Sequence, residues 1–238
     1  MTKNSHKLLI LICSVMIGFS LALSLGPFEN VLAVGPYNAY VVGARRQVNS
    51  VRGSKAYLTT PDVIAQIVGT DSYYSLTYAG TYISDPLWVE TGAREYIPTG
   101  QSTPVYKPRT GWRDASGNVF GYTYTGWNLY PGGWYYYELH YKANSGGNWR
   151  TKIVDGAGTT LIIKDVPLTL SALNEVGSGG ESTDSIGLIG DISTSYNGWQ
   201  QWGTGSWFYY CYTTVYHNPS IPWDITPCGG SYDWTIHF

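Results

Sequence analysis

The stretch YYYELHYKANSGGNWRTKIVDGAG, residues 135–158, decides the fold class because it predicts a β-hairpin. Residues 135–141 are rich in tyrosine and residues 149–154 return with aromatic and β-branched side chains, which is typical of strands. Between them, residues 144–148 hold the Asn, Ser and Gly of a hairpin tip, and residues 155–158 supply another turn. We therefore expect two antiparallel strands here.

The same alternation of strand and turn signals continues in both directions along the chain. The composition agrees, because 22 Tyr, 10 Trp and 29 Gly accompany only 13% charged residues, and no window outside the N-terminal segment shows an apolar helix period. The sequence predicts an all-β fold, an antiparallel β-sandwich or concanavalin-like jelly roll. The further strands are expected at residues 37–42, 55–60, 73–82, 87–92, 105–106, 120–124, 161–163, 172–176, 186–192, 207–216 and 232–238.

The N-terminal segment has the pattern of a secretory signal peptide. Lys3 and Lys7 precede an apolar run over residues 8–25, and Val31-Leu32-Ala33 supplies small residues for cleavage. We expect residues 1–33 to be removed and residues 34–238 to form one secreted, extracellular domain. An uncleaved anchor is the alternative, because the apolar run is about long enough to span a bilayer.

Charge and motifs exclude several classes of function. A formal net charge of −2 with scattered basic residues gives no footprint for nucleic acid. No second apolar span follows the leader, so we expect no stable membrane association after cleavage, and we expect a monomer. The sequence contains no metal-binding spacing and no phosphate-binding loop, and we expect neither metal nor cofactor.

Two cysteines remain after the expected cleavage. Cys211 and Cys228 would be exposed to an oxidising compartment, where the default is one disulfide. Such a bridge would close the C-terminal segment and contribute on the order of 3 kcal/mol to stability.

The glutamates are the remaining candidates for chemistry. Glu90 lies inside an otherwise apolar strand, where a charge is costly unless it is paired or faces a wet cleft. Glu181 follows four small residues that let another chain approach closely. Glu138 is a rival that shares a strand face with Tyr136 and His140, although an exposed cross-strand role fits it as well. The glutamates beyond residue 33 are Glu90, Glu95, Glu138, Glu175 and Glu181.

Three short motifs resemble those of the glutamic-peptidase-like β-sandwiches, the eqolisin and neprosin group and their bacterial relatives. Residues 52–61, RGSKAYLTTP, resemble the entry strand of neprosins. Residues 88–92, WVETG, resemble the strand that carries the first catalytic residue, and residues 176–181, VGSGGE, resemble the segment that carries the catalytic glutamate. The resemblance implies a secreted endopeptidase with a polypeptide substrate and a catalytic pair formed by Glu90 and Glu181.

This resemblance also suggests a mechanism. Glu181 would activate a water molecule as general base, while a protonated Glu90 would donate a hydrogen bond to the developing oxyanion. Two close carboxylates cannot both ionise cheaply, so activity would be confined to acidic pH. Trp88, Tyr136 and Glu138 are the candidate substrate-binding residues.

Two other functions remain open. A small xylanase-like glycoside hydrolase would also be a secreted, aromatic-rich jelly roll with two glutamates, and would act on polysaccharide. A non-catalytic module could bind carbohydrate or cell-wall polymer through exposed aromatic side chains, although core packing is the commoner fate of tryptophan. The aromatic candidates for this module are Trp112, Trp127, Trp134 and Trp149.

Overall fold

A computed structural model describes part of the chain, and all of that part belongs to one compact unit, Val31–Phe238. The expected signal segment, residues 1–33, and the expected disulfide partners, Cys211 and Cys228, lie outside the described residues. The described residues are 40–60, 72–80, 87–143, 148–168, 173–182, 191–201, 205–210, 214–217, 224–226 and 234–237.

The described residues contain fourteen β-strands and no helix, so none of them forms a helix that is long and apolar enough to cross a membrane. Every pair of neighbouring strands is antiparallel. The strands are β1 (Tyr40–Thr59), β2 (Ser72–Gly80), β3 (Trp88–Tyr96), β4 (Val105–Arg113), β5 (Val119–Thr123), β6 (Trp134–Lys142), β7 (Asn148–Asp155), β8 (Thr160–Val166), β9 (Leu173–Ser182), β10 (Ile192–Gln201), β11 (Trp207–Tyr209), β12 (Thr214–His217), β13 (Asp224–Ile225) and β14 (Trp234–His237).

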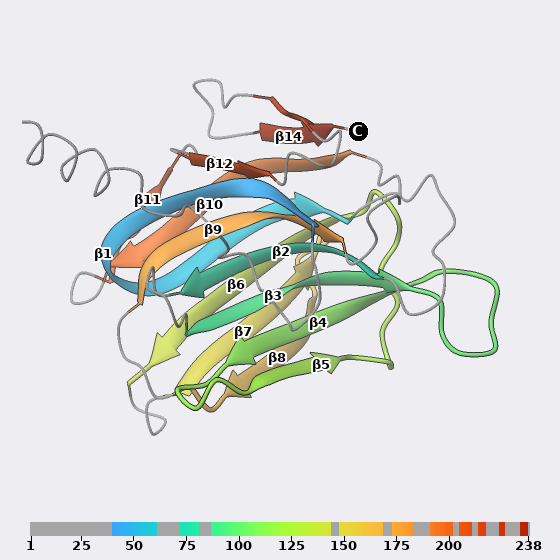
Figure 1. Cartoon of the computed structure of the whole chain (residues 1–238), viewed down its shortest axis with the longest axis horizontal. Helices are drawn as coiled ribbons and strands as arrows, with labels where there is room; N and C mark the ends of the chain where they lie inside the picture. The colour runs from blue at the N-terminus through green and yellow to red at the C-terminus, as the bar shows by residue number, and fades with distance from the viewer. Residues whose placement is uncertain are drawn as a thin grey trace, which may run out of the picture. The chain divides into compact units, whose positions relative to one another are not determined.

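The long strand β1 connects two layers of the sandwich (Figure 1). Its N-terminal half pairs with β9 and β12, and its C-terminal half pairs with β10 and β6. Between the halves the register shifts from Gln47 to Val51, and Ser50 has a positive φ of 56°. Such a bulge lets one strand bend from one layer into the next.

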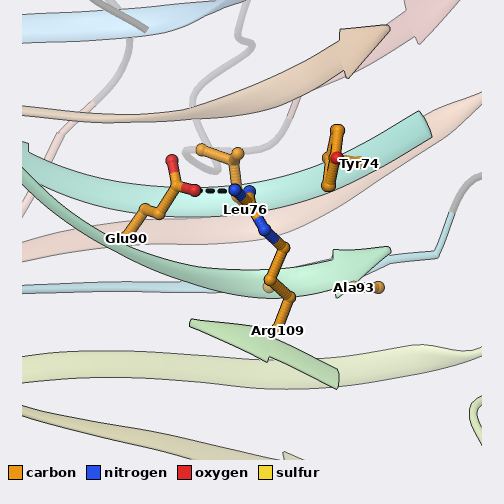
Figure 2. A pocket seen from close by; sticks show the side chains of 6 residues that line it. Tyr74, Leu76, Glu90, Ala93 and Arg109 are labelled. Atoms are coloured by element: carbon orange, nitrogen blue, oxygen red, sulfur yellow. Dashed lines mark hydrogen bonds and ion pairs between the residues drawn. The ribbon is translucent and has the colours of Figure 1, made fainter. Parts of the chain in front are cut away.

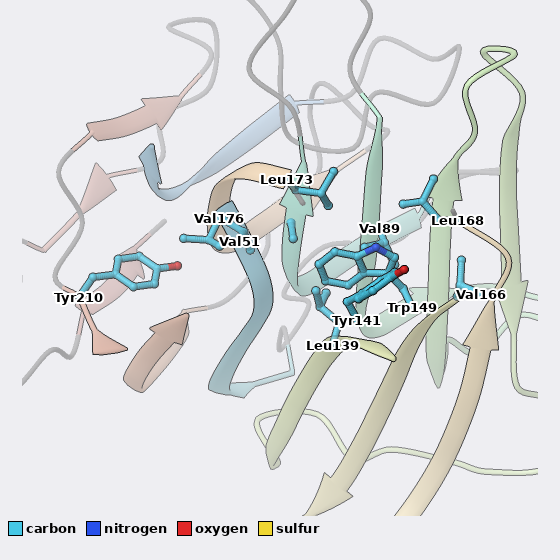
Figure 3. Packing of buried hydrophobic residues seen from close by; sticks show 11 residues of the cluster. Val51, Val89, Leu139, Tyr141, Trp149, Val166, Leu168, Leu173, Val176 and Tyr210 are labelled. Atoms are coloured by element: carbon cyan, nitrogen blue, oxygen red, sulfur yellow. The ribbon is translucent and has the colours of Figure 1, made fainter. Parts of the chain in front are cut away.

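The first layer has the strand order β9-β2-β3-β4-β5, and the second contains β6, β7 and β8. The two layers enclose an apolar cluster in which Val89 and Val176 of the first meet Leu139 and Trp149 of the second. Figure 3 shows Trp149 beside Tyr141 in the middle of this cluster. Burial of these side chains is what holds the layers together.

The inner face of the first layer also carries buried hydroxyl groups. Thr91 and Thr110 lie on this face, and the Thr110 hydroxyl is 2.9 Å from that of Thr151 on β7. Because side chains alternate along a strand, Glu90, next to Thr91, points to the opposite face of the layer. We call this opposite face, which carries Glu90, the outer face of the first layer.

The structure confirms the predicted all-β sandwich, and the hairpin of residues 135–158 is β6 followed by β7. Its second turn ends in Gly158, whose φ is 87°. Two expected segments, 37–42 and 55–60, are joined in the structure by β1, which runs without interruption from Tyr40 to Thr59. The short strand expected at 105–106 continues to Arg113 as β4.

Candidate active site

Glu90 lies in the middle of the outer face of the first layer. On β3 it is opposite Tyr78 of β2 and Gly111 of β4. The residue is 1% exposed, and its Oε1 accepts a hydrogen bond from Nη1 of Arg109 at 2.5 Å. Its other oxygen, Oε2, is buried and has no hydrogen-bond partner among the described residues.

The absence of a side chain at Gly111 leaves the space that the Glu90 carboxyl group occupies. A Cβ atom at this position would lie 2.4 Å from Oε1 of Glu90, which no real contact allows. The carboxyl group therefore lies over Gly111 of β4 and reaches Arg109. Any side chain at position 111 would push it out of this place.

Arg109 lies between Glu90 and the ring of Tyr74, whose centroid is 4.5 Å from the guanidinium carbon (Figure 2). These groups line a small, partly open pocket that leaves no room for a water molecule in this structure. Its lining residues are Tyr74, Leu76, Glu90, Gly92, Ala93 and Arg109. The pocket thus combines an aromatic wall with one carboxyl group and one guanidinium cation.

Burial dominates the electrostatics of Glu90. Removal from water raises the pKa of its carboxyl group, and the charge and hydrogen bond of Arg109 lower it by a smaller amount. The net direction is upward from the ordinary value of 4.5. Glu90 is therefore a carboxyl group that keeps its proton at a higher pH than an exposed glutamate does.

The register places Glu181 on the same face as Glu90 but at some distance. Glu181 of β9 is opposite Tyr74 of β2, whereas Glu90 is opposite Tyr78. The two glutamates are two strands and four residues apart, so their Cα atoms are about 16 Å from each other for ordinary strand spacing. Only the backbone of Glu181 belongs to the described part of the chain.

Another glutamate on this face was not among the sequence candidates. Glu175 of β9 is opposite Gly80 of β2 and is fully buried. Its Oε1 accepts a hydrogen bond of 2.7 Å from the hydroxyl group of Tyr78. The apolar residues Leu173 and Val176 around it could have revealed this carboxyl group, by the argument that singled out Glu90.

The structure brings only one of the three substrate-binding candidates to Glu90. Trp88 lies on the same strand and face and is 2% exposed. Tyr136 and Glu138 are on β6, on the face of the second layer that points away from Leu139 and the core. They are therefore on the opposite side of the sandwich from Glu90.

Glu138 has its own small network on that surface. It accepts hydrogen bonds from the hydroxyl group of Tyr136 and from Nδ1 of His140, the latter at 3.0 Å. Burial raises the pKa of Glu138, but the hydrogen bonds from His140 and Tyr136, together with the charges of His140 and Lys152, outweigh it, so the net shift is downward. Glu138 is an ionised glutamate among hydrogen-bond donors.

The tryptophans expected for a carbohydrate-binding face are divided between core and surface. Trp149 is fully buried, and Trp112 packs against the same cluster. Trp127 and Trp134 are exposed, but Trp134 stacks on Tyr57 at 5.1 Å. Within the described part of the chain, no group of three or more His, Cys, Asp or Glu side chains is placed to hold a metal ion.

Comparison with known proteins places this geometry in a known fold. A crystal structure of scytalido-glutamic peptidase with a transition-state analogue inhibitor superposes with a TM-score of 0.56 at 11% identity, covering 85% of this chain and 99% of the peptidase. SCP-B, a member of the eqolisin family of peptidases in complex with the tripeptide Ala-Ile-His, gives a TM-score of 0.54 at 10% identity with the same coverage. No protein-family model and no curated protein sequence matches the chain.

The fold is therefore the β-sandwich of the glutamic peptidases. This confirms the resemblance drawn from residues 52–61, 88–92 and 176–181 at the level of fold. The chain is similar to these peptidases over nearly their whole length, at an identity that establishes fold alone.

Proposed function

We propose that the protein is a secreted, acid-acting endopeptidase of the glutamic type, with polypeptide as its substrate. The observation that carries the proposal is Glu90, a buried carboxyl group with a raised pKa beside a pocket, in the fold of the glutamic peptidases. Removal of residues 1–33 as a signal peptide would bring it outside the cell.

In this proposal Glu90 is the protonated member of a pair of glutamates. The second member is a glutamate of β9, and the Gly-Gly-Glu motif names Glu181 for this role. The ionised glutamate takes a proton from water, and the water oxygen bonds to the scissile carbonyl carbon. Glu90 donates a hydrogen bond to the carbonyl oxygen as its negative charge develops. The C–N bond then breaks as a proton passes from the carboxyl pair to the leaving amine nitrogen.

The pH dependence follows from this division of roles. The pair is competent only while it holds one proton, since one carboxyl must donate and the other must accept. The raised pKa of Glu90 extends the competent range upward from the ordinary value of a glutamate. Activity should then lie at acidic pH and disappear when Glu90 loses its proton.

The proposal is tested on protein secreted by a host that receives the full chain with its leader. Protein from the medium is assayed on an acid-denatured protein substrate from pH 2 to 7, and its N-terminus is sequenced. We expect cleavage activity at acidic pH and a loss of at least about a hundredfold in Glu90→Leu, because a donor to the oxyanion is removed. The matched control is Asp165→Leu, at an exposed acid of the second layer.

Two results would overturn the peptidase. One is an inactive wild type across the whole pH range, and the other is full activity in Glu90→Leu. Release of reducing sugar from xylan or glucan by the same preparation, lost in Glu90→Gln, would assign the site to a glycoside hydrolase instead.

A further inference from the structure

Glu175 is a buried carboxyl group for which the mechanism above has no use. A carboxylate without exposure is costly in a sheet unless other groups compensate it, so its position calls for an explanation. Glu95 is also fully buried, but it lies an odd number of residues from Glu90 along β3. Its side chain therefore points to the inner face. Of these two, only Glu175 shares the outer face with Glu90.

The register puts Glu175 closer to Glu90 than Glu181 is. The β9 residue opposite Tyr78 is Gly177. Glu175 precedes Gly177 by two residues along β9, whereas Glu181 follows it by four. With ordinary strand spacing, the Cα atoms of Glu175 and Glu90 are about 12 Å apart, against about 16 Å for Glu181 and Glu90. The shorter separation suits two side chains that must reach one substrate group.

Tyr78 lies on the strand between those of the two glutamates, and its hydroxyl group contacts Glu175 directly. It is the β2 partner of both Glu90 on β3 and Gly177 on β9, and it is 1% exposed. Its ring covers Gly177, where a Cβ atom would lie 2.2 Å from a ring carbon. The glycine therefore lets the ring lean over β9, so that its hydroxyl group reaches Glu175.

We infer that Glu175, rather than Glu181, is the β9 carboxylate that acts with Glu90, and that Tyr78 is the residue that positions it. This assignment rests on the proposed peptidase function. A tyrosine hydroxyl that donates to a carboxylate stabilises the ionised form and fixes its orientation. Glu175 is then the acceptor of the water proton, and buried Glu90 is the donor to the oxyanion.

The bonds made and broken are those of ordinary hydrolysis. A water molecule gives a proton to the Glu175 carboxylate, and its oxygen bonds to the carbonyl carbon. Glu90 donates a hydrogen bond from its carboxyl group to the carbonyl oxygen of the tetrahedral intermediate. When the C–N bond breaks, the proton held by Glu175 goes to the amine nitrogen, which leaves a free acid and a free amine.

The test compares Glu175→Gln and Glu181→Gln in the secreted protein, at the pH of highest wild-type activity. We expect kcat/KM to fall by about a hundredfold or more in Glu175→Gln, as for loss of a catalytic acid or base. Glu181→Gln should lose at least ten times less. Thermal unfolding of each variant shows whether it is folded at the assay pH.

Tyr78→Phe keeps the shape of the ring and removes only the hydroxyl group, so it tests the same assignment even if Glu175→Gln does not fold. We expect kcat to fall about ten- to a hundredfold with KM little changed, because a hydrogen bond to a charged group is lost. The acidic limb of the pH profile should also move to higher pH, since ionised Glu175 has lost a donor. A purely structural role of Tyr78 would leave that limb in place.

The outcomes separate this inference from the proposed function. If the wild type cleaves and Glu181→Gln loses as much activity as Glu175→Gln, or more, the assignment of Glu175 is overturned while the peptidase remains. A Tyr78→Phe variant with an unshifted pH profile also overturns it. A wild type without activity at any pH overturns the peptidase itself.

Discussion

Glu90 and Glu138 are both glutamates in the middle of a strand with aromatic neighbours, yet the structure gives them opposite surroundings. Glu90 is 1% exposed and its main partner is Arg109. The Glu138 side chain is 18% exposed and accepts hydrogen bonds from Tyr136 and His140. The pKa of Glu90 is raised, chiefly by burial, and that of Glu138 is lowered by its donors in spite of burial.

The comparison shows that donors and solvent, rather than sequence neighbours, decide which glutamate keeps its proton. Burial favours the neutral form of a carboxyl group, and hydrogen-bond donors to the carboxylate favour its charged form. Only the first can act as a hydrogen-bond donor at mildly acidic pH. The experiments that follow test this difference, from the largest expected effect to the smallest.

The largest effect is expected where the buried ion pair is broken. Arg109→Met should lower the free energy of unfolding at pH 7 by about 3 kcal/mol, because it leaves Glu90 buried without its cation. At pH 4 the loss should shrink, since protonated Glu90 needs no partner. Urea unfolding at the two pH values measures both quantities.

The control for this variant is an exposed ion pair with good geometry. Arg150 binds Asp165 through two hydrogen bonds of 2.6 and 2.9 Å, but both side chains are about a third exposed. Arg150→Met should cost at most about 1 kcal/mol. Equal losses in Arg109→Met and Arg150→Met would show that burial of Glu90 does not strengthen its dependence on the cation.

A second, smaller effect tests the packing around Tyr78 on the Glu90 face. Gly177→Ala would place a methyl group against the Tyr78 ring and should cost about 1–3 kcal/mol through overpacking. Gly126→Ala is the matched control, because no atom lies within 4 Å of its Cβ position, and it should change stability by less than about 0.5 kcal/mol. Chemical denaturation measures the free energy of unfolding of both variants. An unchanged value in Gly177→Ala would mean that the Tyr78 ring moves aside at no cost.

Some of these features could be predicted from the sequence, because they depend on neighbours along the chain. The hairpin of β6 and β7 follows from tyrosine runs and turn residues, and the unusual position of Glu90 follows from its apolar strand. The continuous β1 could not be predicted, since Arg45, Arg46 and Arg52 interrupt its apolar pattern.

The partners of the buried carboxyl groups could not be predicted from the sequence either, because they come from other strands of the sheet. Tyr78 and Glu175 are 97 positions apart in the chain and meet only because β2 and β9 pair in one register. Arg109 reaches Glu90 across the pair of β3 and β4 in the same way. A shift of one residue in either register would send these side chains to the other face.

The third prediction concerns the sign of the pH dependence of stability. The folded-state pKa of Glu90 is raised, so its contribution is present below the unfolded value near 4.5 and is lost as pH rises through the folded value. Glu90→Gln should therefore gain stability relative to wild type as pH rises from about 4.5.

Glu138 should behave in the opposite way. Its folded-state pKa is lowered, so its contribution is present above the unfolded value and is lost as pH falls through the folded one. Glu138→Gln should be less stable than wild type at neutral pH, and the difference should vanish in acid. Unfolding free energies measured from pH 3 to 7 test both variants, and slopes of the same sign would refute the contrast between the two glutamates.

The smallest effect is expected for Tyr136→Phe, which removes one donor from Glu138 and leaves the ring in place. The pKa of Glu138 should rise toward its ordinary value, because the charged form has lost a hydrogen bond while His140 still donates. Stability at pH 7 should fall by about 1 kcal/mol, since the bond is partly exposed to water. Titration of the Glu138 carboxyl carbon by NMR measures the shift, and Glu90 in the same spectra should titrate as in wild type because it lies on the other side of the sandwich. If the pKa of Glu138 stays low without this hydroxyl group, then His140 and the charge of Lys152 keep the carboxylate ionised, and the difference between the two glutamates does not depend on Tyr136.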